Sequence, residues 1–197
     1  MVKRLFDILS SASALVFLSP VLLVVAIIVA VTSSGGAFFR QVRVGRGGKE
    51  FGLLKFRTMR RGSESKGQIT VGGRDPRITG IGYFLRRTKM DELPQLWNVL
   101  IGDMSVVGPR PEVPKYVALY TVEQRAVLQV RPGITSLASI AYINENEVLG
   151  RSADPERTYI EEVMPAKLAL DLPYVHEHGL LQDLRIIART LGRMVFG

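Results

Sequence analysis

The chain has 197 residues, a formal net charge of +8 at pH 7 and 47% apolar residues. This length fits one domain, or one domain with an appendage. The charge favours an anionic partner, which can be nucleic acid, anionic lipid or a phosphorylated small molecule. The chain lacks cysteine, which excludes disulfides and thiolate catalysis, and its two histidines are too few for a multi-histidine zinc site. A required metal would therefore be an oxygen-bound ion such as Mg²⁺. A mean hydropathy of +0.17 in so basic a chain favours a membrane over DNA.

An apolar run from Ile8 to Val31 follows the basic pair Lys3-Arg4. As a straight helix its roughly 24 residues extend about 36 Å, enough to cross a bilayer core. The run is too long for the apolar part of a secretory signal, and no clean small-residue cleavage site follows it. A membrane segment is therefore the prediction.

Pro20 divides this segment, because proline inside a helix removes one backbone hydrogen bond and clashes with the preceding turn. Ser19 can satisfy the carbonyl freed at Leu15 or Val16. A sharp kink would leave two arms of about 12 residues, each near 18 Å and too short to span. Basic residues also flank both ends of the segment, whereas a spanning helix should be asymmetric. We expect a re-entrant membrane helix over residues 1–34, with a simple spanning helix as the alternative, and a catalytic domain over residues 35–197.

Two strands are predicted at 37–44 and 51–57, because apolar and polar residues alternate on both sides of a glycine-rich turn. The turn lacks the context and the ending of a phosphate-binding loop, so a β-hairpin is the better interpretation. Helices are predicted at 82–89, 91–100, 113–130, 155–172 and 180–196. The last is amphipathic, and its cationic stripe suits the plane of a membrane interface or a plain surface helix equally well. The fold class is thus α+β and helix-rich, with a Pro-kinked re-entrant helix, a β-hairpin and several amphipathic interface helices.

The stretch around Asp91 and Glu92 carries the most chemistry. Asp91 has the residue type of a helix N-cap, and Glu92 suits a first turn. Cations that can bind phosphoryl oxygens surround the pair in the sequence: Lys55, Arg57, Arg86, Arg87, Lys89 and Arg110. One carboxylate could attack phosphorus while its neighbour holds Mg²⁺, although a plain helix start explains the pair equally simply.

Three other functions fit less well. A glycosidase needs carboxylates on opposite sides of a sugar, which adjacent residues at a helix start do not provide. The motif of a Walker-type kinase is absent. A membrane-attached basic binding or scaffold protein without catalysis remains the alternative. Nucleic acid is not the expected partner, because few aromatic residues stand among the cations and no helix-turn-helix is evident.

Ordered motifs over most of the chain resemble the bacterial sugar transferases, which are small monotopic phosphoglycosyl transferases. The resemblance rests on these segments: Lys3-Arg4-Leu5-Phe6-Asp7, Ser19-Pro20, Phe38-Phe39-Arg40-Gln41, Lys55-Phe56-Arg57-Thr58-Met59, Asp75-Pro76-Arg77-Ile78-Thr79, Met90 to Leu100, Gly102-Asp103-Met104-Ser105, Val107 to Glu112, and Arg131-Pro132-Gly133-Ile134-Thr135.

The resemblance implies transfer of a sugar-1-phosphate from a UDP-sugar to polyprenol (undecaprenyl) phosphate, with release of UMP. It implies a place in the bacterial inner membrane, with the catalytic domain on the cytoplasmic face. Asp91 would be the nucleophile that forms a covalent phosphosugar, and Glu92 the Mg²⁺ ligand. Arg86 and Arg110 match positions expected near the phosphates. Further candidates are the phosphate binders Lys55, Arg57 and Arg131, the acid Asp171, and the membrane kink at Ser19 and Pro20.

One region departs from the family pattern. After Thr135, members often continue with Gly-Trp-Ala-Gln-Val-Asn-Gly-Arg, whereas this chain has the unrelated stretch Ser136–Glu145. Nucleotide or sugar contacts carried over from segment 136–150 are therefore in doubt, and the donor sugar stays open.

Overall fold

The computed structural model describes residues 2–63, 67, 69–72 and 75–196. The described helices are α1 (Val2–Thr32), α2 (Gly80–Arg87), α3 (Gln95–Ile101), α4 (Pro114–Val117), α5 (Leu137–Ala141), α6 (Glu145–Gly150), α7 (Pro155–Thr158), α8 (Met164–Glu177) and α9 (Leu180–Phe196). The strands are β1 (Phe38–Val44), β2 (Glu50–Phe56), β3 (Ser105–Val107) and β4 (Gly133–Thr135). The predicted helix-rich fold with a few strands is thus confirmed.

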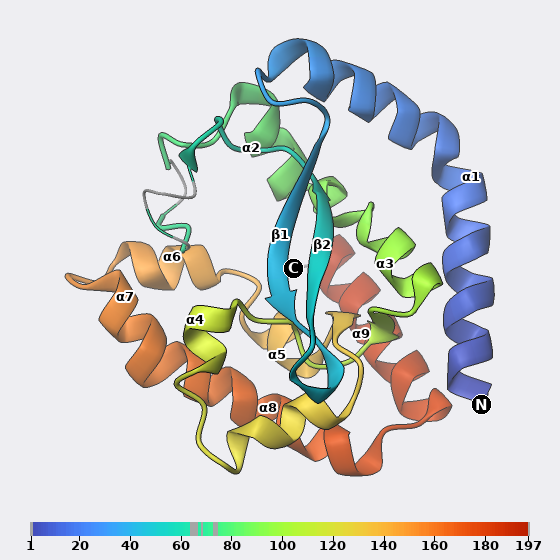
Figure 1. Ribbon diagram of the computed structural model, residues 1–197, viewed down its shortest axis with the longest axis vertical. Coiled ribbons are helices and arrows are strands. Elements are labelled where there is room, and N and C mark those ends of the chain that lie inside the picture. The colour runs from blue at the N-terminus through green and yellow to red at the C-terminus, as the bar shows by residue number, and fades with distance from the viewer. Residues whose placement is uncertain (1, 64–66, 68, 73–74, 197) are drawn as a thin grey trace.

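The predicted β-hairpin is present and lies across one face of the molecule (Figure 1). Strands β1 and β2 pair antiparallel, with Phe38 opposite Phe56 and Val44 opposite Glu50. The connecting turn contains Gly47 and Gly48, both with positive φ, which glycine adopts without steric cost. A second pair, parallel β3 and β4, is too short to show alternation in the sequence and was not predicted.

Helix α1 runs along one edge of the molecule and then bends over its top (Figure 1). It is long and apolar enough to cross a membrane, and only 11% of its most apolar window is buried, unlike the core helix of a soluble protein. Pro20 lies inside α1, and the Ser19 hydroxyl donates a 2.8 Å hydrogen bond to the Val16 carbonyl, as the sequence indicated. Near the end of α1, Val25 and Val29 pack against Phe56 and the α2 side chains.

The first turns of α1 are fastened to the rest of the chain by polar contacts. Lys3 pairs with Asp183 of α9 at 2.5 Å, and Asp183 also accepts a 2.6 Å hydrogen bond from the Tyr174 hydroxyl. Buried Asp7 accepts 3.0 Å hydrogen bonds from the Ser105 hydroxyl and from the Val106 backbone N–H. We call Lys3, Asp7, Ser105, Tyr174 and Asp183 the foot cluster.

The single helix predicted over 113–130 is wrong. The chain forms α4, which ends at Val117, and a separate 3₁₀-helix follows at Gln124–Gln129. Thr121 and Gln124 exchange side-chain-to-backbone hydrogen bonds of 3.0 and 3.2 Å, a capping box that starts a new helix. The helix predicted over 155–172 is confirmed, since α7, a π-helical turn at Tyr159–Val163 and α8 follow one another without a break and α8 continues through Pro173 to Glu177.

The main hydrophobic core lies between α4 and α8, where Tyr116, Val117, Tyr159 and Leu168 are buried. It lies on the side of the hairpin away from α1 (Figure 1). The molecule therefore has a membrane-candidate helix along one edge and a packed core on the other side of the hairpin.

Candidate active site at the Asp91–Glu92 turn

Asp91 and Glu92 lie in a single 3₁₀ turn, Met90–Glu92, that directly follows a residue in left-handed conformation, Lys89 (φ +56°). The predicted N-cap role of Asp91 is wrong. Helix α3 starts only at Gln95, with Pro94 in the cap position. The tight turn buries Asp91 and leaves Glu92 half-buried, and both residues line the cleft described below.

Glu92 is held by two cations. Arg110 donates to both carboxylate oxygens, with Nη1 lying 3.1 Å from Oε2 and Nη2 contacting Oε1, and Lys55 Nζ lies 3.4 Å from Oε1. Burial alone would raise the pKa of Glu92, but Arg110 and Lys55 outweigh burial and hold this pKa well below its usual range. Glu92 is therefore a fixed anion.

Asp91 differs from its neighbour. It is 7% exposed, and no described residue donates a hydrogen bond to its carboxylate or pairs with it within 4 Å. Burial and the adjacent Glu92 raise the pKa of Asp91, against the opposing charges of Lys55 and Arg86. A carboxylate without donors and with a raised pKa keeps its lone pairs available, which suits a nucleophile.

Arg110 reaches Glu92 because two backbone segments come unusually close. A Cβ atom on Gly108 would lie 2.3 Å from the Arg131 carbonyl oxygen, and one on Gly133 would lie 2.1 Å from the Gly108 nitrogen. Only glycine fits at both positions. The β3–β4 pairing and the prolines on either side of Arg110 thus fix its backbone beside the Asp91–Glu92 turn.

A cleft of about 440 Å³ opens beside this turn. Five of the predicted site residues line it: Lys55, Arg86, Asp91, Glu92 and Arg110. Burial lowers the pKa of Lys55 to about 8, although Glu92 opposes the shift. Arg86 donates 2.9 and 3.0 Å hydrogen bonds to the hydroxyls of Thr58 and Thr70.

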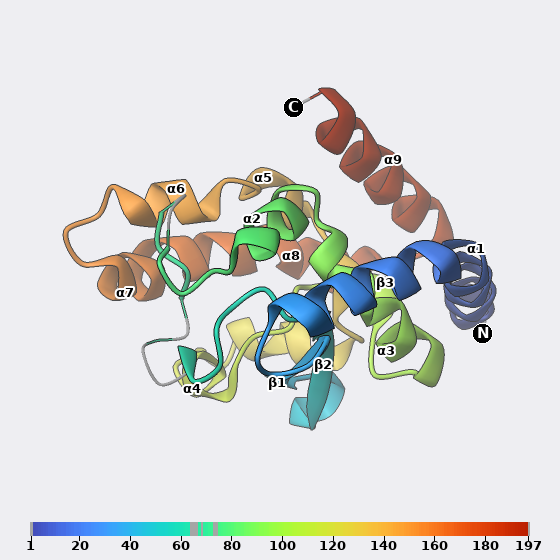
Figure 2. The same ribbon diagram turned by 90° about the horizontal axis from the view of Figure 1, so that it is seen from above.

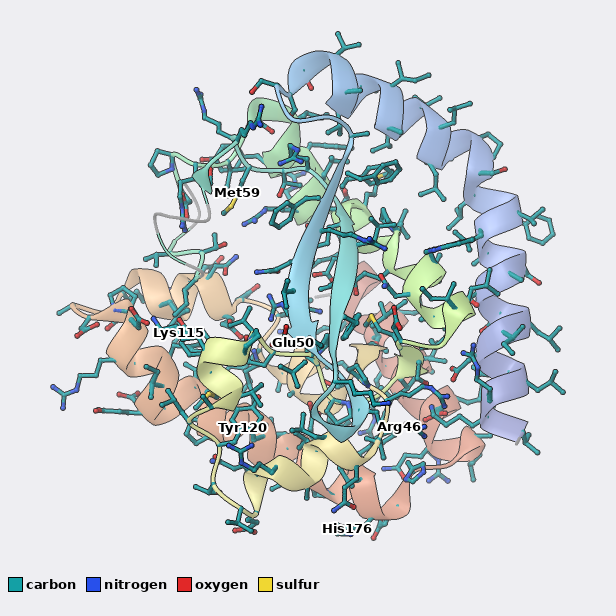
Figure 3. The ribbon with its side chains drawn as sticks, in the orientation of Figure 1. Arg46, Glu50, Met59, Lys115, Tyr120 and His176 are labelled. Carbon is teal, nitrogen blue, oxygen red and sulfur yellow. The ribbon has the colours of Figure 1, made fainter. Side chains whose placement is uncertain are left out.

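Three predicted residues do not line the cleft. Arg57 follows the end of β2 and donates to the carbonyls of Gly36 (3.2 Å) and Phe38 (3.0 Å). Arg131 donates a 2.9 Å hydrogen bond to the Gly102 carbonyl. Burial together with the nearby Arg46, at the hairpin tip in Figure 3, lowers the pKa of Arg131.

Asp171 also lies outside the cleft, as a buried acid that accepts a 3.1 Å hydrogen bond from the Ala138 N–H. Burial raises the pKa of Asp171 to about 6. The Ser136 side chain and the Arg110 backbone also donate hydrogen bonds to this carboxylate, so Asp171 links segment 136–150 to the backbone of the residue that holds Glu92.

Another part of the cleft was missed by sequence reasoning. Arg43 pairs with Glu112 at 3.0 Å, the Tyr159 hydroxyl donates to Glu112, and Lys167 pairs with Glu145 at 2.5 Å. All five residues line the cleft. Segment 136–150, which departs from the family pattern, supplies six lining residues: Ser139, Ile140, Tyr142, Ile143, Glu145 and Asn146. The alternation along β1 could have indicated which face of the hairpin Arg43 occupies. No local pattern predicts its contact with Glu112, which is far away in the sequence.

A cleft that holds a fixed carboxylate, an unpaired carboxylate and several cations suits an anionic ligand such as a phosphate group, and the same chain carries a helix long enough to cross a membrane. Residues 1–197 match the family described as Bacterial sugar transferase, and the chain belongs to this family.

Several members of the family are similar to this chain. The UDP-glucose:undecaprenyl-phosphate glucose-1-phosphate transferase of Caulobacter vibrioides is 36% identical over 192 residues, which cover 96% of this chain and 68% of that protein. The enzyme of the same name from Klebsiella pneumoniae is 40% identical over 96% of this chain but only 39% of its own length. The UDP-N-acetylgalactosamine-undecaprenyl-phosphate N-acetylgalactosaminephosphotransferase of Aeromonas hydrophila is 35% identical over all of this chain and 44% of its own length. The chain thus spans less than half of these last two relatives.

Proposed function

We propose that the protein transfers a sugar-1-phosphate from a UDP-sugar to polyprenol (undecaprenyl) phosphate and thereby initiates glycan or polysaccharide assembly. The relatives named above carry names of this reaction with different sugars. The observation that carries the proposal is the contrast within the Asp91–Glu92 turn, where two cations hold one carboxylate and none pairs with the other.

In the first step an Asp91 carboxylate oxygen attacks the β-phosphorus of the UDP-sugar. A bond forms between this oxygen and phosphorus, the bond from phosphorus to the bridging oxygen breaks, and UMP leaves with that oxygen. The product is an acyl phosphate that links Asp91 to the sugar. Lys55, Arg86 and Arg110 lie around the turn as cations for the diphosphate oxygens, where negative charge develops.

In the second step a phosphate oxygen of the polyprenol phosphate attacks the phosphorus of the phosphosugar. The new bond makes a polyprenol diphosphosugar, and the bond to Asp91 breaks, which restores the carboxylate. Because UMP leaves and the acceptor oxygen attacks opposite the bond between Asp91 and phosphorus, UMP must depart before the acceptor can react. Kinetics of the ping-pong type are expected.

A Mg²⁺ ion fits the residues present with Glu92 as its protein ligand. No group of three or more acidic or histidine side chains gathers in the described ranges, so protein oxygens alone would not enclose the ion. Mg²⁺ commonly binds through one or two carboxylates plus substrate phosphates and water, and the fixed Glu92 carboxylate retains lone pairs beyond those used by Arg110 and Lys55. Such an ion would neutralise charge on the departing diphosphate oxygens.

The same proposal places α1 in the bacterial inner membrane as a re-entrant helix kinked at Ser19 and Pro20, with the cleft on the cytoplasmic face. The Ser19 hydrogen bond and the basic residues at both ends of α1 support this topology. Because the chain lacks cysteine, Val2→Cys and Ser34→Cys test it in intact cells. Neither should react with an impermeant thiol reagent, whereas labelling of one of the two would indicate a spanning helix.

The experiment for the activity uses UDP-sugar labelled in the sugar, without acceptor. Label should remain on the protein at Asp91 with release of one UMP, and the acceptor should discharge it. Asp91→Asn should abolish both label and turnover, and full turnover by this variant would refute the assignment. Measuring UMP release across a panel of UDP-sugars then identifies the donor. A basic scaffold protein would instead show salt-sensitive binding of anionic partners that the Asp91 substitution leaves unchanged.

A further inference from the structure

One side of the cleft is formed by α9 and the elements packed on it. Thr190 Oγ1 of α9 lies 2.7 Å from Thr135 Oγ1 of β4, and α5 packs against the same helix. Three residues after Thr190, Arg193 also lines the cleft. A cationic side chain from the C-terminal helix therefore lies on the same cavity as Asp91.

An apolar wall connects the Asp91–Glu92 turn with this helix. Leu93 and Leu96, just beyond the two carboxylates, line the cleft together with Ile134 and Ile140. Ile134 packs with Val99 and Met104 at the end of α3, whereas Ile140 packs in the cluster that contains Ile187 of α9. Apolar side chains thus continue from the reacting carboxylate to α9.

The two helices that border this wall also carry apolar residues on their outer faces. On α3, Trp97 and Ile101 are 49% and 51% exposed, and on α9, Leu184 and Leu191 are likewise exposed. Helix α9 starts beside α1, joined to it by the Lys3–Asp183 pair, and then runs out from the body of the molecule (Figure 2). An apolar chain lying in a bilayer can therefore reach the cleft along protein surface that is apolar as well.

We propose that this side of the cleft is the acceptor site, in which the apolar wall holds the first isoprenoid units and the Arg193 guanidinium binds the acceptor phosphate. The inference rests on the proposed function and adds the residues that receive the second substrate. A lipid phosphate needs this combination of a cation and an apolar path, whereas a nucleotide sugar, polar throughout, does not.

The distribution of charge supports the division of the cleft. Lys55 and Arg110 contact Glu92 at the turn, where the donor diphosphate would lie. Arg193 forms no ion pair with any carboxylate in the described part of the chain, so its charge is available to a second phosphate group. Arg189, one turn earlier on α9, is exposed and does not line the cleft, which makes it a matched control.

The test separates the two steps for Arg193→Gln, Arg193→Lys and Arg189→Gln. In rapid-quench experiments without acceptor, the UMP burst and the label on Asp91 should match the wild-type protein within about twofold in all three variants. On addition of undecaprenyl phosphate, the discharge of label at limiting acceptor should slow by about 10- to 100-fold in Arg193→Gln, the size expected for one charge-assisted hydrogen bond. Arg193→Lys should recover most of that loss, and Arg189→Gln should discharge at the wild-type rate.

Unchanged discharge in Arg193→Gln, or a burst slowed as much as the discharge, would overturn the acceptor site. An equal loss in Arg189→Gln would mean that α9 acts only through attraction to anionic lipid, and would also overturn it. The proposed function fails separately, if the wild-type protein forms no label on Asp91 at all. Burst and discharge therefore distinguish the two failures.

Discussion

The cleft and the foot cluster are built from the same kinds of residue but do different things. In the foot cluster, each Asp183 carboxylate oxygen accepts one hydrogen bond, from Lys3 or Tyr174, and Asp7 accepts two. None of these residues lines the cleft. Around the Asp91–Glu92 turn, cations outnumber the carboxylates, and an open volume adjoins them. Paired charges in a filled interior anchor a helix, whereas excess cationic charge beside a cavity is available to an anionic ligand.

The comparison also explains why the two clusters respond differently to substitution. A change in the foot cluster removes a partner from a buried charge, so the penalty appears in folding. A change in the cleft removes a charge that the substrate would meet, so the penalty appears in turnover.

Arg110→Met should lower kcat/KM for the UDP-sugar by about 10³-fold, because truncating one partner of a buried, hydrogen-bonded charge pair costs about 2–5 kcal/mol. The substitution leaves Glu92 with Lys55 alone and removes a cation from the donor phosphates. Steady-state release of UMP measures kcat/KM. Arg110→Lys is the control, because it retains the positive charge but loses the contact with both carboxylate oxygens. A normal rate in Arg110→Met would place the donor phosphates elsewhere.

Asp183→Asn should lower the unfolding free energy by about 3 kcal/mol, because it leaves Lys3 without its buried partner. For a chain of this size that corresponds to a fall of about 6–12 °C in Tm, measured in detergent or nanodiscs. Glu123→Gln, an exposed acid outside both clusters, should leave Tm unchanged. If the Asp183 substitution left Tm intact but abolished turnover, the foot cluster would belong to catalysis.

Lys55 gives a pH dependence whose sign follows from its lowered pKa of about 8. Above that pH the amine loses its charge in the free enzyme, so kcat/KM for the donor should fall by up to about tenfold per pH unit. Lys55→Arg should shift this limb beyond pH 10, because arginine stays charged.

The unfolding free energy changes with pH in the opposite direction to kcat/KM. The folded pKa lies below the ordinary 10.5, so the unfolded chain binds more protons between the two values and this group's contribution to stability rises there with pH. If kcat/KM of Lys55→Arg still falls above about pH 8, a group other than Lys55 causes the fall.

Local patterns predicted much of the fold. The hairpin followed from alternation and glycine, and α9 from its apolar repeat, with bounds at 180 and 196 in both prediction and structure. The helix predicted over 113–130 failed because Val113, Tyr116, Val117 and Tyr120 repeat with helical spacing although the chain breaks among them. The capping box at Thr121 was the signal against that helix, and the apolar period masked it.

At the candidate active site, residue types and spacing predicted that Asp91, Glu92 and nearby cations belong together, but not which of the cations contact the two carboxylates. Lys55 and Arg57 would share a face on a continuing strand, yet β2 ends at Phe56 and Arg57 turns back to the Gly36 carbonyl. The contact of Arg110 with Glu92 depends on the β3–β4 pairing, which joins residues far apart in the chain. Local sequence patterns therefore could not predict that pairing.

Lys89 tests whether the backbone turn before the carboxylates is strained. Lys89→Val should be less stable than Lys89→Gly by about 1–2 kcal/mol, because a β-branched residue strongly disfavours the left-handed conformation that Lys89 adopts. Both variants remove the same charge, so their difference in Tm isolates the backbone from the electrostatics of Asp91. Equal Tm values would show that the turn relaxes without cost.

Arg57→Gln should have the smallest effect and so marks the edge of the catalytic region. Its guanidinium is occupied by two backbone carbonyls and lies 5.6 Å from the Phe39 ring, outside the cleft. We expect kcat/KM within about twofold of wild type and a stability loss under about 1 kcal/mol, the usual size for an exposed contact. Lys55→Gln should lose far more activity, because Lys55 lies within β2 and lines the cleft. A large loss in Arg57→Gln would mean that the residue swings into the cleft when substrate binds, and the boundary between the anchored and the substrate-binding cations would have to move.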